Sequence, residues 1–211
     1  MTLFADFSLV NHGPGLGYSV DSTGNISSAG RNVSDEAMAF DGGKTSTERR
    51  LKLALIDQLE MGMDLIELLD DQTYSGLTDS PGSIGAHIRH NINFVDALID
   101  GAISGSIDNS TRSRDRRIET DRSSASAKLR SLIDALTKVP MNVAELTSVG
   151  SELDPSVQHL STLGRELEFG ISHTIHHYAL IRERLAKTGV NLNARFGVAP
   201  STLEYWRSEK R

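Results

Sequence analysis

Hydrophobic residues recur at helical spacing in four long segments, separated by stretches rich in polar residues and glycine. Positions three or four residues apart lie on one face of a helix, so each segment predicts a helix with one apolar face. The second and fourth segments carry the clearest stripes, which are Ile84, Ile88, Ile92, Val95, Ile99 and Ile103, and Leu163, Leu167, Ile171, Tyr178, Ile181 and Leu185. The pattern predicts an all-α protein, a four-helix bundle whose apolar faces share one core.

Residues that favour helix starts precede each segment. The predicted caps are Thr45 with Glu48, Ser80 before Pro81, Ser123 or Ser124, and Ser161 or Thr162. Gly62 lies on the apolar face of the first helix, where the missing side chain lets a neighbouring helix approach closely.

The segments outside these helices divide the chain into parts. Residues 1–44 sustain no apolar period, and we expect a disordered or loosely packed extension. Residues 45–200 hold the predicted helices, and 201–211 form a tail. Between the third and fourth helices, residues 141–160 change to alternation around a turn, which predicts a short β-hairpin.

Composition and charge limit the metal ligands and the partners that we expect for this chain. The chain has 211 residues, a net charge of -6 and no cysteine, so a metal would need His, Asp or Glu ligands. Acidic residues interleave with the arginines of 106–122, so we expect no nucleic-acid partner. The first residues lack the basic segment and long apolar run of a signal peptide, and no stretch approaches the roughly 20 apolar residues of a membrane span. We therefore expect a cytoplasmic protein that makes no membrane contact.

Three histidines occur within one helical stretch of the fourth segment. His173 and His177 are four residues apart and share a face, together with Glu166 two turns earlier, whereas His176 points away from them. The second helix offers His87 and His90 at the border of its own apolar stripe. Three neutral imidazoles suit a divalent ion such as Zn, Ni or Fe(II) and leave positions open for water or substrate.

Such an ion would lower the pKa of a bound water or thiol. Glu166 is a candidate hydrogen-bond partner of the ligands, or a base, beside it. The alternative is a non-catalytic helical bundle, a dimer whose histidines are structural or whose metal site is vestigial. The periodicity alone favours neither interpretation.

Two stretches together resemble the DinB-like superfamily, the DinB/YfiT-like metalloenzymes. They are 83–90 (SIGAHIRH) and 161–177 (STLGRELEFGISHTIHH), and the resemblance spans about residues 46–200. It implies a four-helix bundle with up-down-down-up topology and a divalent metal held by one histidine of the second helix and two of the last.

By that resemblance the ligands are His90, His173 and His177, with His87 as an alternate or neighbouring group. Where similar relatives often carry Asp and His, this chain has Asn93 and Phe94. Characterised relatives include enzymes that act with low-molecular-weight thiols, which makes such a thiol a candidate cofactor or small-molecule substrate.

Overall fold

The computed structural model describes residues 19–20, 26–27, 43–76, 82–110, 115–154 and 156–209. The chain divides into two compact units, Met1–Phe40 and Asp41–Arg211. In the first unit the described residues form β1 (Ser19–Val20) and β2 (Ile26–Ser27), which pair in antiparallel fashion. The rest of the extension predicted over 1–44 lies outside the described residues, except that the first long helix already begins at Gly43.

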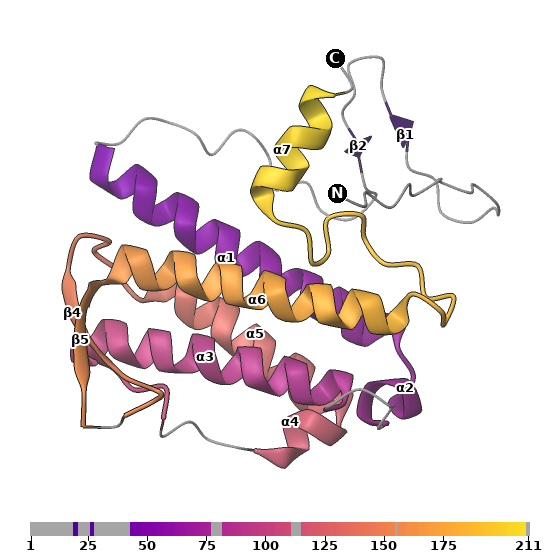
Figure 1. Ribbon diagram of the computed structural model, residues 1–211, viewed down its shortest axis with the longest axis horizontal. Helices are drawn as coiled ribbons and strands as arrows, with labels where there is room; N and C mark the ends of the chain where they lie inside the picture. The colour runs from indigo at the N-terminus through magenta and orange to yellow at the C-terminus, as the bar shows by residue number, and fades with distance from the viewer. Residues whose placement is uncertain are drawn as a thin grey trace, which may run out of the picture. The chain divides into compact units, whose positions relative to one another are not determined.

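The second unit is mostly helical (Figure 1), so the predicted helical class is confirmed. Its helices are α1 (Gly43–Leu68), α2 (Asp71–Ser75), α3 (Ile84–Ser104), α4 (Arg116–Thr120), α5 (Arg122–Lys138), α6 (Leu163–Leu185) and α7 (Pro200–Ser208). Its strands are β3 (Ser106–Ile107), β4 (Leu146–Gly150) and β5 (Gln158–Thr162). The part of the chain that is described contains no helix long and apolar enough to cross a membrane.

The four long helices bury their apolar faces against one another. α1 packs against α5 and α6, and α3 packs against the same two helices. Their core includes Leu55, Leu59, Ile88, Ile92, Leu129, Leu132, Leu167 and Ile181, each no more than 2% exposed. The positions predicted from the apolar spacing therefore lie inside, and this packing sets α3 beside α6. Ile103 is the exception: it was predicted in the core stripe of the second helix but is 71% exposed, because it lies in the last turn of α3.

The predicted hairpin is present as β4 and β5, which are antiparallel, with Ser148 opposite Leu160. A third strand, β3, pairs in parallel with β4 directly after α3. Two residues are too few to show an alternating pattern, so this strand could not be recognised from the sequence.

Three predicted helix starts are wrong in position, those of α1, α3 and α5. The N-cap of α3 is Ser83, whose hydroxyl accepts a hydrogen bond from the Ala86 amide at 3.0 Å. Ser80 and Pro81 lie outside the described residues. The N-cap of α5 is Asp121, because a carboxylate with two oxygens accepts from the amides of both Ser123 and Ser124.

The predicted start of α6 is confirmed, since the Thr162 hydroxyl accepts from the Arg165 amide at 3.2 Å. At α1 the predicted capping pair, Thr45 with Glu48, is wrong. The helix begins before Thr45, and Glu48 accepts instead from the Met141 amide at 2.9 Å. That bond joins the first turns of α1 to the loop after α5.

Candidate metal centre

α6 carries the two histidines of the predicted pair. His173 and His177 lie one helical turn apart, and their ring centroids are 4.7 Å from each other. α6 is held in place from α1, because the buried Tyr178 hydroxyl donates to the Gln58 carbonyl at 2.9 Å. Tyr178 thus points into the core, whereas the side chain of the preceding residue, His177, points toward α3.

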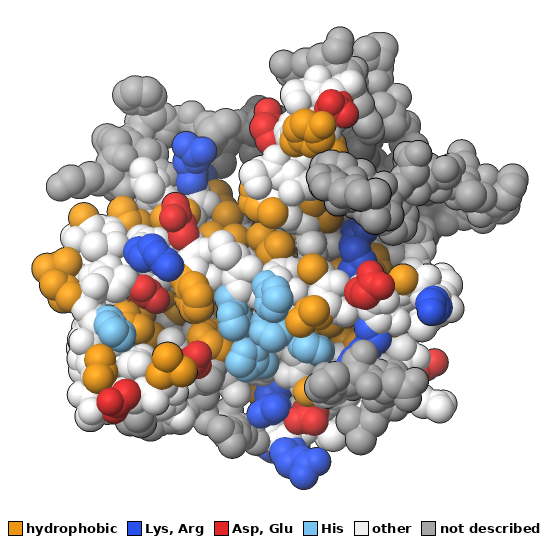
Figure 2. Space-filling view, in the orientation of Figure 1, with side chains coloured by type: hydrophobic (Ala, Val, Ile, Leu, Met, Phe, Trp, Pro, Cys, Tyr) orange, Lys and Arg blue, Asp and Glu red, His pale blue; other side chains and the backbone are white. Residues whose placement is uncertain are grey.

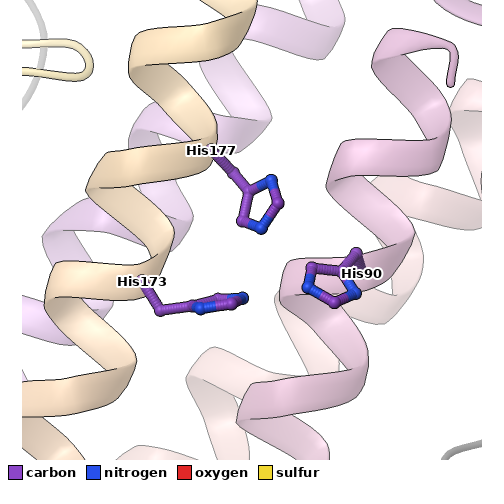
Figure 3. A group of neighbouring side chains, drawn as sticks. All are labelled: His90, His173 and His177. Atoms are coloured by element: carbon purple, nitrogen blue, oxygen red, sulfur yellow. The ribbon is translucent and has the colours of Figure 1, made fainter. Parts of the chain in front are cut away.

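α3 brings a third imidazole to this pair. The ring of His90 lies 4.6 Å from that of His177 and 5.0 Å from that of His173, between ring centroids. One nitrogen from each of His90, His173 and His177 lies within 4.8 Å of the others. Figure 3 shows the three rings converging in the space between the two helices.

Contacts at the start of α3 hold it in register with α6. The Arg184 guanidinium of α6 donates to the Gly82 carbonyl, immediately before the Ser83 cap. The His87 amide in turn donates to the Ser83 carbonyl at 3.2 Å. The last turns of α6 are therefore bound to the first turn of the helix that carries His90.

The three imidazoles are half-buried rather than enclosed. In the space-filling view, histidine side chains gather in one patch near the middle of the face (Figure 2). A site of this kind has a protein side that positions the nitrogens and an open side that a small ligand can reach.

Burial and neighbouring rings favour the neutral form of these histidines. Burial, with the nearby His90 and His173, lowers the pKa of His177 to about 3. Burial and then the positive charge of Arg184 lower the pKa of His87. A neutral imidazole keeps the lone pair that a metal ion requires.

His87 lies at the edge of the group and contacts one member of it. Its Nδ1 is 2.9 Å from the Nδ1 of His177, and the two ring centroids are 5.1 Å apart. The three-histidine group found among the described residues does not include it. His87 is thus a neighbour of the site, one of the two roles that the sequence left open.

Two other predicted residues lie apart from the convergent nitrogens. His176 is exposed on α6, with its ring 5.4 Å from that of His177, as the helical spacing predicts. The Glu166 carboxylate accepts a hydrogen bond from the Ser161 hydroxyl at 2.6 Å. Its proposed role as a base stays a prediction.

Aromatic residues border the site, and no role there was predicted for any of them from the sequence. The ring of Phe94 lies 4.1 Å from that of His173 and 4.9 Å from that of His90. Phe169 lies 5.6 Å from His173, and the guanidinium of Arg165 lies over its ring. The apolar spacing could place Phe94 at i+4 from His90 but could not show that it reaches α6.

The donor set fits a divalent ion. Two nitrogens on one tetrahedral zinc lie roughly 3.3 Å apart, because Zn–N bonds are about 2.0–2.1 Å. The candidate nitrogens lie within 4.8 Å of one another, so each pair needs to approach by no more than roughly 1.5 Å to reach that separation. Imidazole nitrogens suit Zn, Ni and Fe(II).

Comparisons with known proteins give limited information. No protein-family model matches the chain. A stretch of 103 residues is 33% identical to FK506-binding protein 5 of Rhizopus delemar, which covers 46% of this chain and 27% of that protein. The chain thus matches only about a quarter of the length of this relative.

Proposed function

We propose that this protein is a DinB-like metalloprotein in which His90, His173 and His177 hold a divalent ion. The observation that carries the proposal is the convergence of one nitrogen from each ring within 4.8 Å, from two different helices. A hydrogen bond can bring two imidazole nitrogens together, whereas three convergent nitrogens suit a shared cation. The resemblance of 83–90 and 161–177 to DinB-like proteins supports the same ligand set.

The proposal includes the finer description of the fold, a four-helix bundle of up-down-down-up topology. The packing of α1 and α3 against both α5 and α6 supports it. In such a bundle the site is built from side chains on facing helices, here α3 and α6.

We further propose an enzyme of the thiol-dependent transferase or hydrolase type that acts on a small molecule. Three protein ligands leave at least one coordination position open, and the site is reachable from solvent. A bound divalent ion supplies Lewis acidity, which lowers the pKa of a coordinated water or thiol. The residues of this chain would position the ion, and Phe94 and Phe169 border the imidazole of His173.

Metal analysis of the untagged protein tests the metal site. We expect stoichiometric Zn, Ni or Fe after purification or reconstitution, and its loss in His90→Ala, His173→Ala and His177→Ala. The matched controls are His176→Ala, on the same helix, and His159→Ala, on β5, which should both keep the metal. If the wild type binds no metal, or His173→Ala binds as much as the wild type, the histidines are structural and the non-catalytic interpretation stands.

A spectroscopic titration tests the ligand class. Cobalt(II)-substituted protein should develop a sulfur-to-metal charge-transfer band when a small thiol such as 2-mercaptoethanol is added. A cobalt spectrum that no thiol changes would argue against thiol chemistry while leaving the metal site in place.

A further inference from the structure

A hydrogen bond joins His177 to a histidine outside the three-nitrogen group. The Nδ1 atoms of His87 and His177 lie 2.9 Å apart, which is an ordinary hydrogen-bond distance. Two imidazole nitrogens can bond only if one carries a proton and the other offers its lone pair. The contact therefore requires that one of the two Nδ1 atoms carries a proton and that the other does not.

The hydrogen bond also occupies both Nδ1 atoms, so neither can direct a lone pair at a shared ion while the bond is made. Two nitrogens on one tetrahedral zinc would be roughly 3.3 Å apart, and each would direct its lone pair at the metal rather than at the other ring. At 2.9 Å the two Nδ1 atoms face each other instead. His177 then has only Nε2 left for an ion, and its ring lies beside those of His90 and His173 (Figure 3).

We infer that His87 is a positioning residue for the metal site. Its Nδ1 accepts a hydrogen bond from Nδ1–H of His177, which holds His177 in the tautomer whose Nε2 lone pair faces His90 and His173. This inference rests on the proposed function, because it assigns a role toward the same ion. Partners of this kind orient a ligating imidazole and raise its basicity, and they are usually carboxylates, carbonyls or water.

The local structure explains why an imidazole can serve here. His87 precedes His90 by three residues, so α3 presents one histidine to the ion and a second, one turn earlier, to a ligand on α6. The bond from Arg184 to the Gly82 carbonyl ties the same two helices at the adjoining turn. The distance between His87 and His177 is thus set by helix packing and not by a flexible loop.

Two substitutions at His87 distinguish the effect of the acceptor nitrogen from the effect of the ring's size and shape. His87→Phe keeps a planar ring but removes the acceptor, and we expect zinc affinity to fall by about 10- to 100-fold in competition with a chromophoric chelator. His87→Asn places an amide oxygen near the position of Nδ1 and should restore affinity to within about threefold. His176→Phe is the matched control, because His176 neighbours His177 without being in the three-histidine group.

Nitrogen-15 NMR of the zinc-loaded wild type gives a second readout that folding alone would not change. We expect the proton of His177 on Nδ1 and the metal on Nε2. The inference is overturned if His177 carries its proton on Nε2, if His87→Phe binds zinc as tightly as the wild type, or if His87→Asn is as weak as His87→Phe. A wild type that binds no zinc overturns the proposed function itself, and so the two failures are distinguishable.

Discussion

The phenol of Tyr178 lies directly against Gly62, where α6 crosses α1. A Cβ on Gly62 would lie 3.3 Å from Cζ of Tyr178 and still closer to its hydroxyl oxygen. The phenol cannot move aside easily, because it is fully buried and donates to the Gln58 carbonyl at 2.9 Å. The absence of a side chain at Gly62 therefore allows the contact that sets α6 on α1, one residue beyond His177.

Gly62→Ala should destabilise the protein by about 1–3 kcal/mol, because an added methyl group in a packed interface forces strain. Urea unfolding measures the change. A double-mutant cycle with Tyr178→Phe is the control, since removing the hydroxyl makes room for the methyl group. The explanation fails if the two substitutions have purely additive effects.

Arg182→Met should loosen the segment that follows α6. The guanidinium donates to the carbonyls of Phe196, Asn193 and Ala194 at 2.8, 2.8 and 3.0 Å. Phe196 is buried and stacks on Tyr178 with the ring centroids 4.3 Å apart. We expect a loss of about 1–3 kcal/mol in urea unfolding.

The control for this substitution is Arg207→Met, which removes an exposed arginine whose partner, Glu204, is also exposed. It should change stability by no more than about 0.5 kcal/mol. Equal effects of the two substitutions would contradict the anchoring role of Arg182.

Phe94→Ala should cost both stability and metal affinity. Phe94 is 7% exposed and its ring contacts His90 and His173, so its loss leaves a cavity beside two of the candidate ligands. We expect a loss of about 3–5 kcal/mol in urea unfolding and weaker zinc binding in chelator competition. Phe169→Ala, at a position 37% exposed, should cost much less stability. A Phe94→Ala variant that binds zinc as tightly as the wild type would show that the site does not depend on this ring.

Glu166→Gln should leave zinc affinity within about threefold of the wild type. The carboxylate accepts from Ser161 at 2.6 Å and is not part of the three-histidine group, so an amide can take over its hydrogen bond. Chelator competition measures the affinity. A loss of tenfold or more would instead place Glu166 among the groups that bind or orient the ion.

The stability of the metal-free protein should fall as the solution becomes more acidic. The pKa of His177 is 6.5 in the unfolded chain and about 3 in the folded protein, so the unfolded state takes up a proton first. The contribution of His177 to stability is complete above about pH 6.5 and is lost progressively as the pH falls toward about 3. Urea unfolding in the presence of a chelator should show this slope, and His177→Asn should flatten it. Parallel slopes would contradict the depressed pKa.

Much of the framework could be predicted from the sequence because it depends on local spacing. The apolar stripes place Leu167 and Ile181 in the core, and the turn after β4 predicts its hairpin with β5. The caps were less predictable, since Ser80 and Ser83 are both good N-caps and only the backbone path selects Ser83.

The sequence by itself determined that His173 and His177 share a face, because a helix repeats every 3.6 residues whatever surrounds it. Helical spacing could not choose between His87 and His90, which lie one turn apart on a single border of α3, and only the family resemblance favoured His90. The packing of α3 against α6 made that choice. It brings His90 to the two nitrogens of α6 and leaves His87 at 2.9 Å from the far side of His177. If α3 were shifted by one helical turn against α6, His87 and His90 would exchange places. The register between two helices is set by their packing in the tertiary structure.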